Sequence, residues 1–154
     1  MKTTYRILIV DDEENVRRML ATAFSLQGHE THCASDGKAA LSLFSETQPD
    51  VVLMDIRMPE MDGIDALKVM RTQQPRIPVI LMTAYAEVET AVEALRSGAF
   101  DYVIKPFDLD ELSMVIQRAL QLQEMKQEIR NLHKALTTSW QWGHILTTSP
   151  RMMD

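Results

Sequence analysis

The 154-residue sequence contains a single cysteine, Cys33, so it can form no internal disulfide bond. Its longest apolar runs, 51–54 and 79–82, are much too short to cross a bilayer. Lysine and arginine form no block or stripe, and the formal net charge of −6 gives no electrostatic basis for binding nucleic acid. The Gly-x-x-x-x-Gly-Lys-Ser/Thr loop that cradles nucleotide phosphates is absent as well. These absences predict a cytoplasmic protein in a reducing compartment, without membrane or nucleic-acid contacts of its own.

The stretch 51–55 is the centre of the remaining pattern. Four apolar residues followed by Asp55 predict a short strand buried on both faces, with Pro49 before it and Pro59 after it. In open α/β sheets the carboxyl ends of the strands are the edge where ligands bind. We interpret Asp55 as a nucleophile that accepts a phosphoryl group.

Strand patterns alternate with segments of helical periodicity along the first two thirds of the chain. The predicted strands are 6–10, 30–34, 51–55, 79–83 and 101–105. The predicted helices are 14–27, one capped by Asp36, one opened by Gly63, 87–97 and one starting near 108. The expected buried positions of the second and third helices are Ala39, Ala40, Leu43, Phe44, Ile64, Leu67, Val69 and Met70.

This alternation predicts an α/β, flavodoxin-like (βα)5 fold with a parallel five-stranded sheet in the order 2-1-3-4-5 and an extended C-terminal helix. The more polar strand 30–34 is expected near an edge of the sheet. Cys33 is expected to be a small residue buried in that strand.

Polar side chains end four of the predicted strands. The strand order makes the first and third strands neighbours, so Asp11, Asp12 and Asp55 converge on one crevice. Close carboxylates repel one another, and Mg²⁺ is the hard divalent cation that suits such oxygen ligands. Thr83 and Lys105 end the next two strands and offer a hydroxyl and an ammonium to phosphoryl oxygens. Each feature alone is more often a helix cap, a turn or a strand end; their combination favours phosphoryl transfer.

Four segments resemble the receiver domain of two-component response regulators. The resemblance covers residues 5 to about 120 and rests on 7–13 (ILIVDDE), 54–63 (MDIRMPEMDG), 82–85 (MTAY) and 102–107 (YVIKPF). It implies that Asp55 takes its phosphoryl group from a phosphohistidine on a sensor histidine kinase.

The resemblance also implies the ligands of the metal. Asp12, Asp55 and the backbone carbonyl of Arg57 would bind Mg²⁺, with Asp11 acting partly through water. In receiver domains the positions of Arg57 and Tyr85 flank the path of the water that hydrolyses the aspartyl phosphate; ordinary surface residues are the alternative.

A conformational switch follows from the same resemblance. Thr83 and Lys105 would bind the phosphoryl oxygens, and movement of Thr83 would vacate space into which Tyr102 rotates. The Lys105–Pro106 bond is expected to be cis. Phosphorylation would thereby change an interaction surface formed by the helix 87–97, the strand 101–105 and the last helix.

The last predicted helix continues beyond the length that a receiver domain needs. Residues 108–136 contain neither Gly nor Pro, and apolar residues with steps of three and four form a heptad seam: Leu122, Met125, Ile129, Leu132 and Leu136. Lys126 and Glu128 flank the seam. We expect a parallel homodimer; a helix packed against its own domain is the alternative.

The end of the chain resembles the linker and first residues of the central ATPase domain of NtrC-like transcription activators. Trp140 and Trp142 suggest a docking surface, and a disordered end is the alternative. The expected organisation is a receiver domain at 1–120, a helical dimerisation linker at 121–139, and a linker leading into the ATPase domain at 140–154. In the intact protein, that ATPase domain and RNA polymerase holoenzyme would be partners. A free-standing receiver and a Mg²⁺-dependent phosphatase are the alternative functions.

Overall fold

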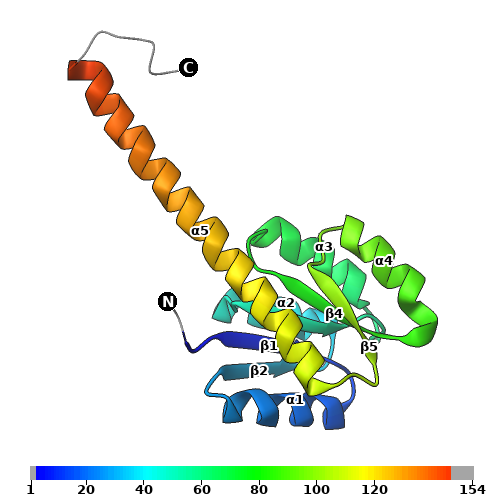
Figure 1. Ribbon diagram of the computed structural model, residues 1–154. Coiled ribbons are helices and arrows are strands. Elements are labelled where there is room, and N and C mark those ends of the chain that lie inside the picture. The colour runs from blue at the N-terminus through cyan, green and yellow to red at the C-terminus, as the bar shows by residue number, and fades with distance from the viewer. Residues whose placement is uncertain (1–2, 147–154) are drawn as a thin grey trace. The chain divides into compact units, whose positions relative to one another are not determined.

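The computed structural model describes residues 3–146, and the side chains of all of these except residues 85 and 138–146. Strands and helices alternate along the chain as predicted (Figure 1). The elements are β1 Arg6–Val10, α1 Glu14–Leu26, β2 Glu30–Ala34, α2 Gly37–Thr47, β3 Val51–Asp55, α3 Gly63–Gln73, β4 Val79–Ala84, the 3₁₀ turn η1 Tyr85–Glu87, α4 Val88–Arg96, β5 Asp101–Lys105 and α5 Leu109–Leu146. The chain divides into two compact units, Met1–Leu120 and Gln121–Asp154.

The strands form one parallel sheet in the predicted order 2-1-3-4-5, with β2 and β5 at its edges (Figure 1). Val10 of β1 lies opposite Met54 of β3, and Asp55 of β3 lies opposite Met82 of β4. On the neighbouring strand β5, Lys105 lies opposite Ala84, the last residue of β4. This register brings the carboxyl ends of four neighbouring strands to the same edge.

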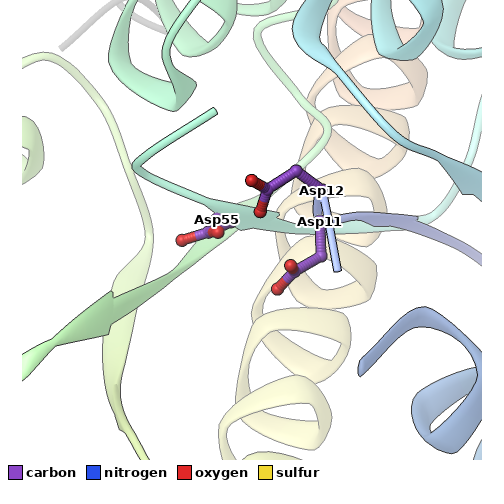
Figure 2. A group of neighbouring side chains, drawn as sticks. All are labelled: Asp11, Asp12 and Asp55. Carbon is purple, nitrogen blue, oxygen red and sulfur yellow. The ribbon is translucent and has the colours of Figure 1, made fainter. Parts of the chain in front are cut away.

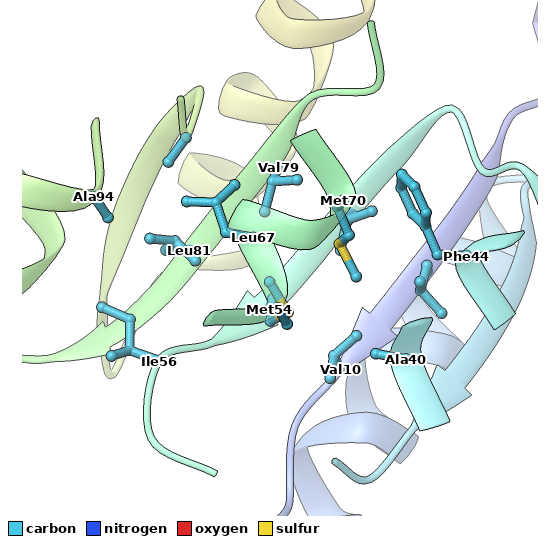
Figure 3. Close-up of a cluster of buried hydrophobic side chains, with 14 of the residues drawn as sticks. Val10, Ala40, Phe44, Met54, Ile56, Leu67, Met70, Val79, Leu81 and Ala94 are labelled. Carbon is cyan, nitrogen blue, oxygen red and sulfur yellow. The ribbon is translucent and has the colours of Figure 1, made fainter. Parts of the chain in front are cut away.

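One face of the sheet is covered by α2, α3 and α4, whose buried residues pack against alternate strand residues (Figure 3). Phe44, Leu67 and Met70 are among the largest fully buried side chains of this cluster. The other face is covered by α1 and the first part of α5, through residues such as Phe24 and Ile116. Since both faces are buried, the central strands read as continuous apolar runs rather than alternating ones.

The predicted buried positions of α2 and α3 need correction in detail. Ala39, Leu43 and Ile64 are only partly buried where they pack against the core. Val69 is half-buried, and Ala66 is fully buried although it was not predicted to be.

The prediction that Cys33 is buried is wrong. Cys33 is exposed, with its Sγ 4.0 Å from the carbonyl oxygen of Arg17 on α1. It lies on β2, an edge strand of which only Ala34 is buried. An edge strand has a neighbour on one side only, so its side chains are covered less completely than those of a central strand.

The last helix is long, as predicted, and its backbone remains helical past residue 139 to Leu146. Within the second unit the seam residues are exposed, with exposed fractions from 38% at Leu122 to 66% at Leu136. Trp140 and Trp142 lie outside the residues whose side chains are described. Among the described residues, no helix is both long and apolar enough to span a membrane.

Candidate functional site

Three carboxylates meet at the edge of the sheet where the strands end, as predicted. Asp11 and Asp12 follow β1, and Asp55 is the last residue of β3 (Figure 2). One oxygen from each of the three lies within 4.8 Å of the others. Asp11 is fully buried, Asp55 is 8% exposed and Asp12 is exposed. The cluster thus opens to solvent on the side of Asp12.

The position of Asp55 is fixed by a close contact between β3 and the start of α3. The N–H of Gly63 donates a hydrogen bond to the carbonyl oxygen of Ile56 at 2.7 Å. A Cβ atom at Gly63 would collide with the backbone carbonyl oxygen of Asp55. Asp62 caps α3 by accepting a hydrogen bond from the N–H of Asp65 at 2.9 Å. The first turn of α3 therefore supports the main chain that carries the Asp55 side chain.

Lys105 joins two of the three carboxylates. Its Nζ donates to Oδ2 of Asp11 at 2.7 Å and lies 3.5 Å from Oδ2 of Asp55. The other oxygen of Asp11 accepts a hydrogen bond from the N–H of Glu13 at 2.9 Å. Asp11 is thus held by one ammonium and one backbone amide, while Asp55 has Lys105 at a longer distance.

The negative charge of Asp55 is only partly balanced by the positive groups around it. Burial, and then the charge of Asp11, raise the pKa of Asp55 to about 6, against the opposing charge of Lys105 and the backbone N–H of Arg57. Burial alone would lower the pKa of Lys105, but the hydrogen bond to Asp11 and the charge of Asp55 raise it above its ordinary value. An all-oxygen cluster with excess negative charge is the environment that a hard divalent cation prefers.

Thr83 and Tyr102 lie on the adjacent strands β4 and β5, where Tyr102 is opposite Leu81 and Thr83 is opposite Ile104. Thr83 follows Met82, the residue opposite Asp55, and is buried. Its hydroxyl donates to the carbonyl oxygen of Ala84 at 3.1 Å. Tyr102 is half-buried against the core under α2, α3 and α4, and it lines a cavity of about 650 Å³ along β5. The Lys105–Pro106 bond is cis, as predicted.

Sequence reasoning missed the partner of the Arg57 side chain. Nη2 of Arg57 lies 2.7 Å from Oε1 of Glu87, at the N-cap of α4. The two residues are 30 positions apart and both lie in connections rather than in strands. No periodic pattern relates them; only the adjacency of β3 and β4 in the predicted order pointed to their proximity. The Tyr85 side chain, which was predicted to flank the same path, lies outside the described residues.

Comparison with known proteins gives a consistent answer. A family model, the response regulator receiver domain, matches residues 7–117. Over all 154 residues the chain is 77% identical to the regulatory protein AtoC of Escherichia coli K12, of which it covers 33%. Over 148 residues, 96% of the chain, it is 36% identical to the DNA-binding transcriptional regulator NtrC of Escherichia coli K12, of which it covers 31%. The chain spans about a third of the length of these curated relatives.

Solved structures show the same similarity. The crystal structure of NtrX from Brucella abortus in complex with ADP matches with a TM-score of 0.80 and 37% identity, over 84% of this chain and 30% of that one. The isolated receiver domain of NtrX matches with a TM-score of 0.72 and 39% identity, over 75% of this chain and 98% of the other. The predicted resemblance is confirmed.

Proposed function

The chain belongs to the response regulator receiver domain family, and on that premise we propose that Asp55 accepts a phosphoryl group from a phosphohistidine of a sensor histidine kinase. The observation that carries the proposal is the placement of Asp55 beside Asp11, Asp12 and Lys105 at one sheet edge. Receiver domains are signalling domains, and we propose that this one has no enzyme activity beyond assisting its own phosphorylation and dephosphorylation. The predicted cytoplasmic location stays a prediction.

The transfer needs an ionised Asp55. With a pKa of about 6, the carboxylate is mostly deprotonated at neutral pH and can attack phosphorus. An O–P bond forms to Asp55 as the P–N bond of phosphohistidine breaks, and the electron pair goes to the imidazole nitrogen. Lys105, which is 3.5 Å from Oδ2 of Asp55, is in reach of the transferred phosphoryl oxygens. We assign it, with Thr83, to holding them.

The oxygen donors at the site fit Mg²⁺. Asp12 and Asp55, the backbone carbonyl of Arg57 and, through water, Asp11 would hold it. When bound, Mg²⁺ supplies charge neutralisation for the acidic site and for the phosphoryl group. The exposed position of Asp12 suits a ligand that reaches out to a cation, whereas buried Asp11 is already engaged by Lys105 and Glu13.

Phosphorylation would act through Thr83 and Tyr102. For the Thr83 hydroxyl to contact a phosphoryl oxygen, it must leave its hydrogen bond to the Ala84 carbonyl. Tyr102 is half-buried on the neighbouring strand, and we propose that its ring rotates into the space that Thr83 vacates. The added charge of about −1.5 to −2 is the driving force for this repacking.

The second unit would pass the signal on as a dimer. Five apolar side chains at heptad spacing are exposed along α5, and a second copy in parallel orientation would cover them. We propose a receiver domain at 1–120, a dimerisation helix at 121–139, and a linker at 140–154 leading to an ATPase domain that acts with RNA polymerase holoenzyme. The identity to AtoC and NtrC supports this organisation, because the chain covers about a third of each.

Phosphoramidate, a small donor with a P–N bond, tests the central claim. With Mg²⁺, intact-mass measurement should show one added phosphoryl group on the wild type and none on Asp55→Asn. Asp36→Asn is the matched control, since it also removes one carboxylate but retains a good helix cap. Equal labelling of Asp55→Asn and wild type would overturn the proposal.

A further inference from the structure

The ion pair between Arg57 and Glu87 connects the loop that follows Asp55 with the turn η1 that precedes α4. Arg57 lies two residues after Asp55, and Glu87 lies four residues after Thr83, at the N-cap of α4. The guanidinium Nη2 and the carboxylate Oε1 are 2.7 Å apart. The pair therefore links the loop that follows the predicted phosphoacceptor to the helix whose surface is expected to change.

The two members of the pair are held very differently. The Arg57 side chain is 75% exposed, so it can reorient without losing packing. The Glu87 side chain is only 22% exposed, and its second oxygen accepts a contact from the Thr90 hydroxyl at 3.5 Å. Glu87 occupies the N-cap of α4 yet makes no side-chain capping hydrogen bond. Glu87 is thus fixed to the first turn of α4, and Arg57 is the mobile partner.

Arg57 is also anchored beside Asp55. It follows Asp55 by two residues, and its backbone N–H lies close enough to the Asp55 carboxylate to oppose the rise of that group's pKa. A guanidinium binds phosphoryl oxygens in a planar, bidentate geometry, and a phosphoryl group carries more negative charge than the single carboxylate of Glu87. A phosphoryl group on Asp55 would therefore compete with Glu87 for the same cation.

We infer that Arg57 is shared between two partners, Glu87 while Asp55 is unmodified and the phosphoryl oxygens once Asp55 is phosphorylated. Transfer of Arg57 releases Glu87 and with it the start of α4. Arg57 and Glu87 are then positioning residues that couple the phosphoryl group to α4, in addition to Thr83 and Tyr102. The inference depends on the proposed phosphorylation of Asp55.

The competition makes a prediction that a purely structural ion pair does not make. Glu87→Gln frees Arg57 and should tighten binding of beryllofluoride, a phosphoryl mimic, by about 2- to 5-fold, the range expected for an exposed ion pair. Arg57→Gln should weaken binding of the mimic by a similar factor. Opposite signs for the two single variants are the signature, because loss of a merely structural contact shifts both in the same direction.

The double variant separates competition from repulsion between charges. Removal of the Glu87 charge would also lessen repulsion of the anionic mimic, and that effect would persist without Arg57. Competition predicts that Glu87→Gln has no effect on mimic affinity in the Arg57→Gln background. Glu30→Gln is the matched control, since it removes one exposed carboxylate from the ion pair with Arg6 at the opposite edge of the sheet and should leave the affinity unchanged.

The measurement is titration of the 154-residue chain with beryllofluoride in Mg²⁺, followed by amide NMR of Val88–Arg96. Even without the mimic, Glu87→Gln should move these amides toward their mimic-bound positions. Single variants that shift affinity in the same direction, or an undiminished Glu87→Gln effect in the Arg57→Gln background, would overturn the inference alone. Binding that survives in Asp55→Asn would overturn the proposed function and this inference with it.

Discussion

The charge on Asp55 is costly to the folded protein. Burial, with the nearby charge of Asp11, raises its pKa to about 6 from an ordinary value of 3.8. The folded state binds the proton of the Asp55 carboxyl more tightly than the unfolded chain does, so protonation of Asp55 stabilises the folded state. This stabilisation is fully present below pH 4 and is lost as the pH rises through 6. Two pKa units correspond to about 3 kcal/mol. At neutral pH without a cation, the ionised Asp55 therefore lowers the free energy of unfolding.

Asp55→Asn removes this penalty, so the variant should gain stability relative to the wild type as the pH rises. In chelator, the difference in free energy of unfolding should move in favour of Asp55→Asn by up to about 3 kcal/mol as the pH rises from 4 to 7.5, with most of the change between about pH 4 and pH 6. Urea unfolding at several pH values measures it. Added Mg²⁺ should narrow the gap at pH 7.5 by stabilising the wild type. A difference that does not vary with pH would contradict the prediction.

Gly63 is the residue on which the position of Asp55 depends most directly. Gly63→Ala places a methyl group against the Asp55 carbonyl oxygen, and should lower stability by about 1–3 kcal/mol and mimic affinity by at least about tenfold. Gly28→Ala is the control, because φ there is +91° and no atom lies within 4 Å of the added Cβ. That variant should lose about 1–2 kcal/mol of stability through backbone strain yet retain mimic affinity. Equal losses of affinity in both variants would contradict the role of Gly63.

At the scale of single elements, α2 shows how a local sequence signal fixes a boundary. Asp36 accepts a hydrogen bond from the N–H of Ala39 at 2.8 Å, as its position before the helix predicted. Asp36→Ala should lower the free energy of unfolding by about 0.5–2 kcal/mol, and Asp36→Ser should restore most of it. Chemical denaturation compares the three proteins. Equal losses in the Ala and Ser variants would indicate that packing, not capping, fixes this helix end.

The elements could be predicted because their signals are local. Apolar runs ending in polar residues marked the central strands, and Gly63 and Asp36 marked helix starts. The site followed from one further step, since parallel register brings strand ends such as Asp11 and Asp55 to one edge. The pairing of Arg57 with Glu87 could not be predicted, because it depends on side-chain directions in two loops.

Some local detail was predicted wrongly for a related reason. Helical periodicity predicts which face of a helix is buried but not how closely each residue approaches the sheet. For this reason Val69 was assigned to the core and Ala66 was not. Cys33 was assigned by residue type, whereas its exposure depends on the position of β2 at the edge. The turn Tyr85–Glu87 also delays α4 to Val88, one residue after its predicted start.

At the scale of the whole molecule, the second unit has an apolar stripe that its own described side chains leave uncovered. Leu122, Met125, Ile129, Leu132 and Leu136 are all exposed. Two heptads are short for a coiled coil, so a dimer held by this stripe alone would be marginal. Its strength can therefore depend on the receiver domains, which is what a phosphorylation-dependent regulator requires.

Ile129→Glu places a charge in the middle of the stripe and should abolish the dimer. Gln127→Glu is the matched control, because it adds the same charge to an exposed position on the side of the helix away from the stripe. Light scattering of the 17.6 kDa chain with Mg²⁺ should give twice that mass for the wild type and Gln127→Glu in the presence of beryllofluoride, and the monomer mass for Ile129→Glu. If the wild type is also a dimer without the mimic, the helix dimerises constitutively and phosphorylation rearranges an existing dimer. If the wild type is a dimer only with the mimic, and Asp55→Ala is not, phosphorylation of the receiver domain controls dimerisation. A monomer under all conditions would refute the dimer and favour a free-standing receiver that signals by binding another protein.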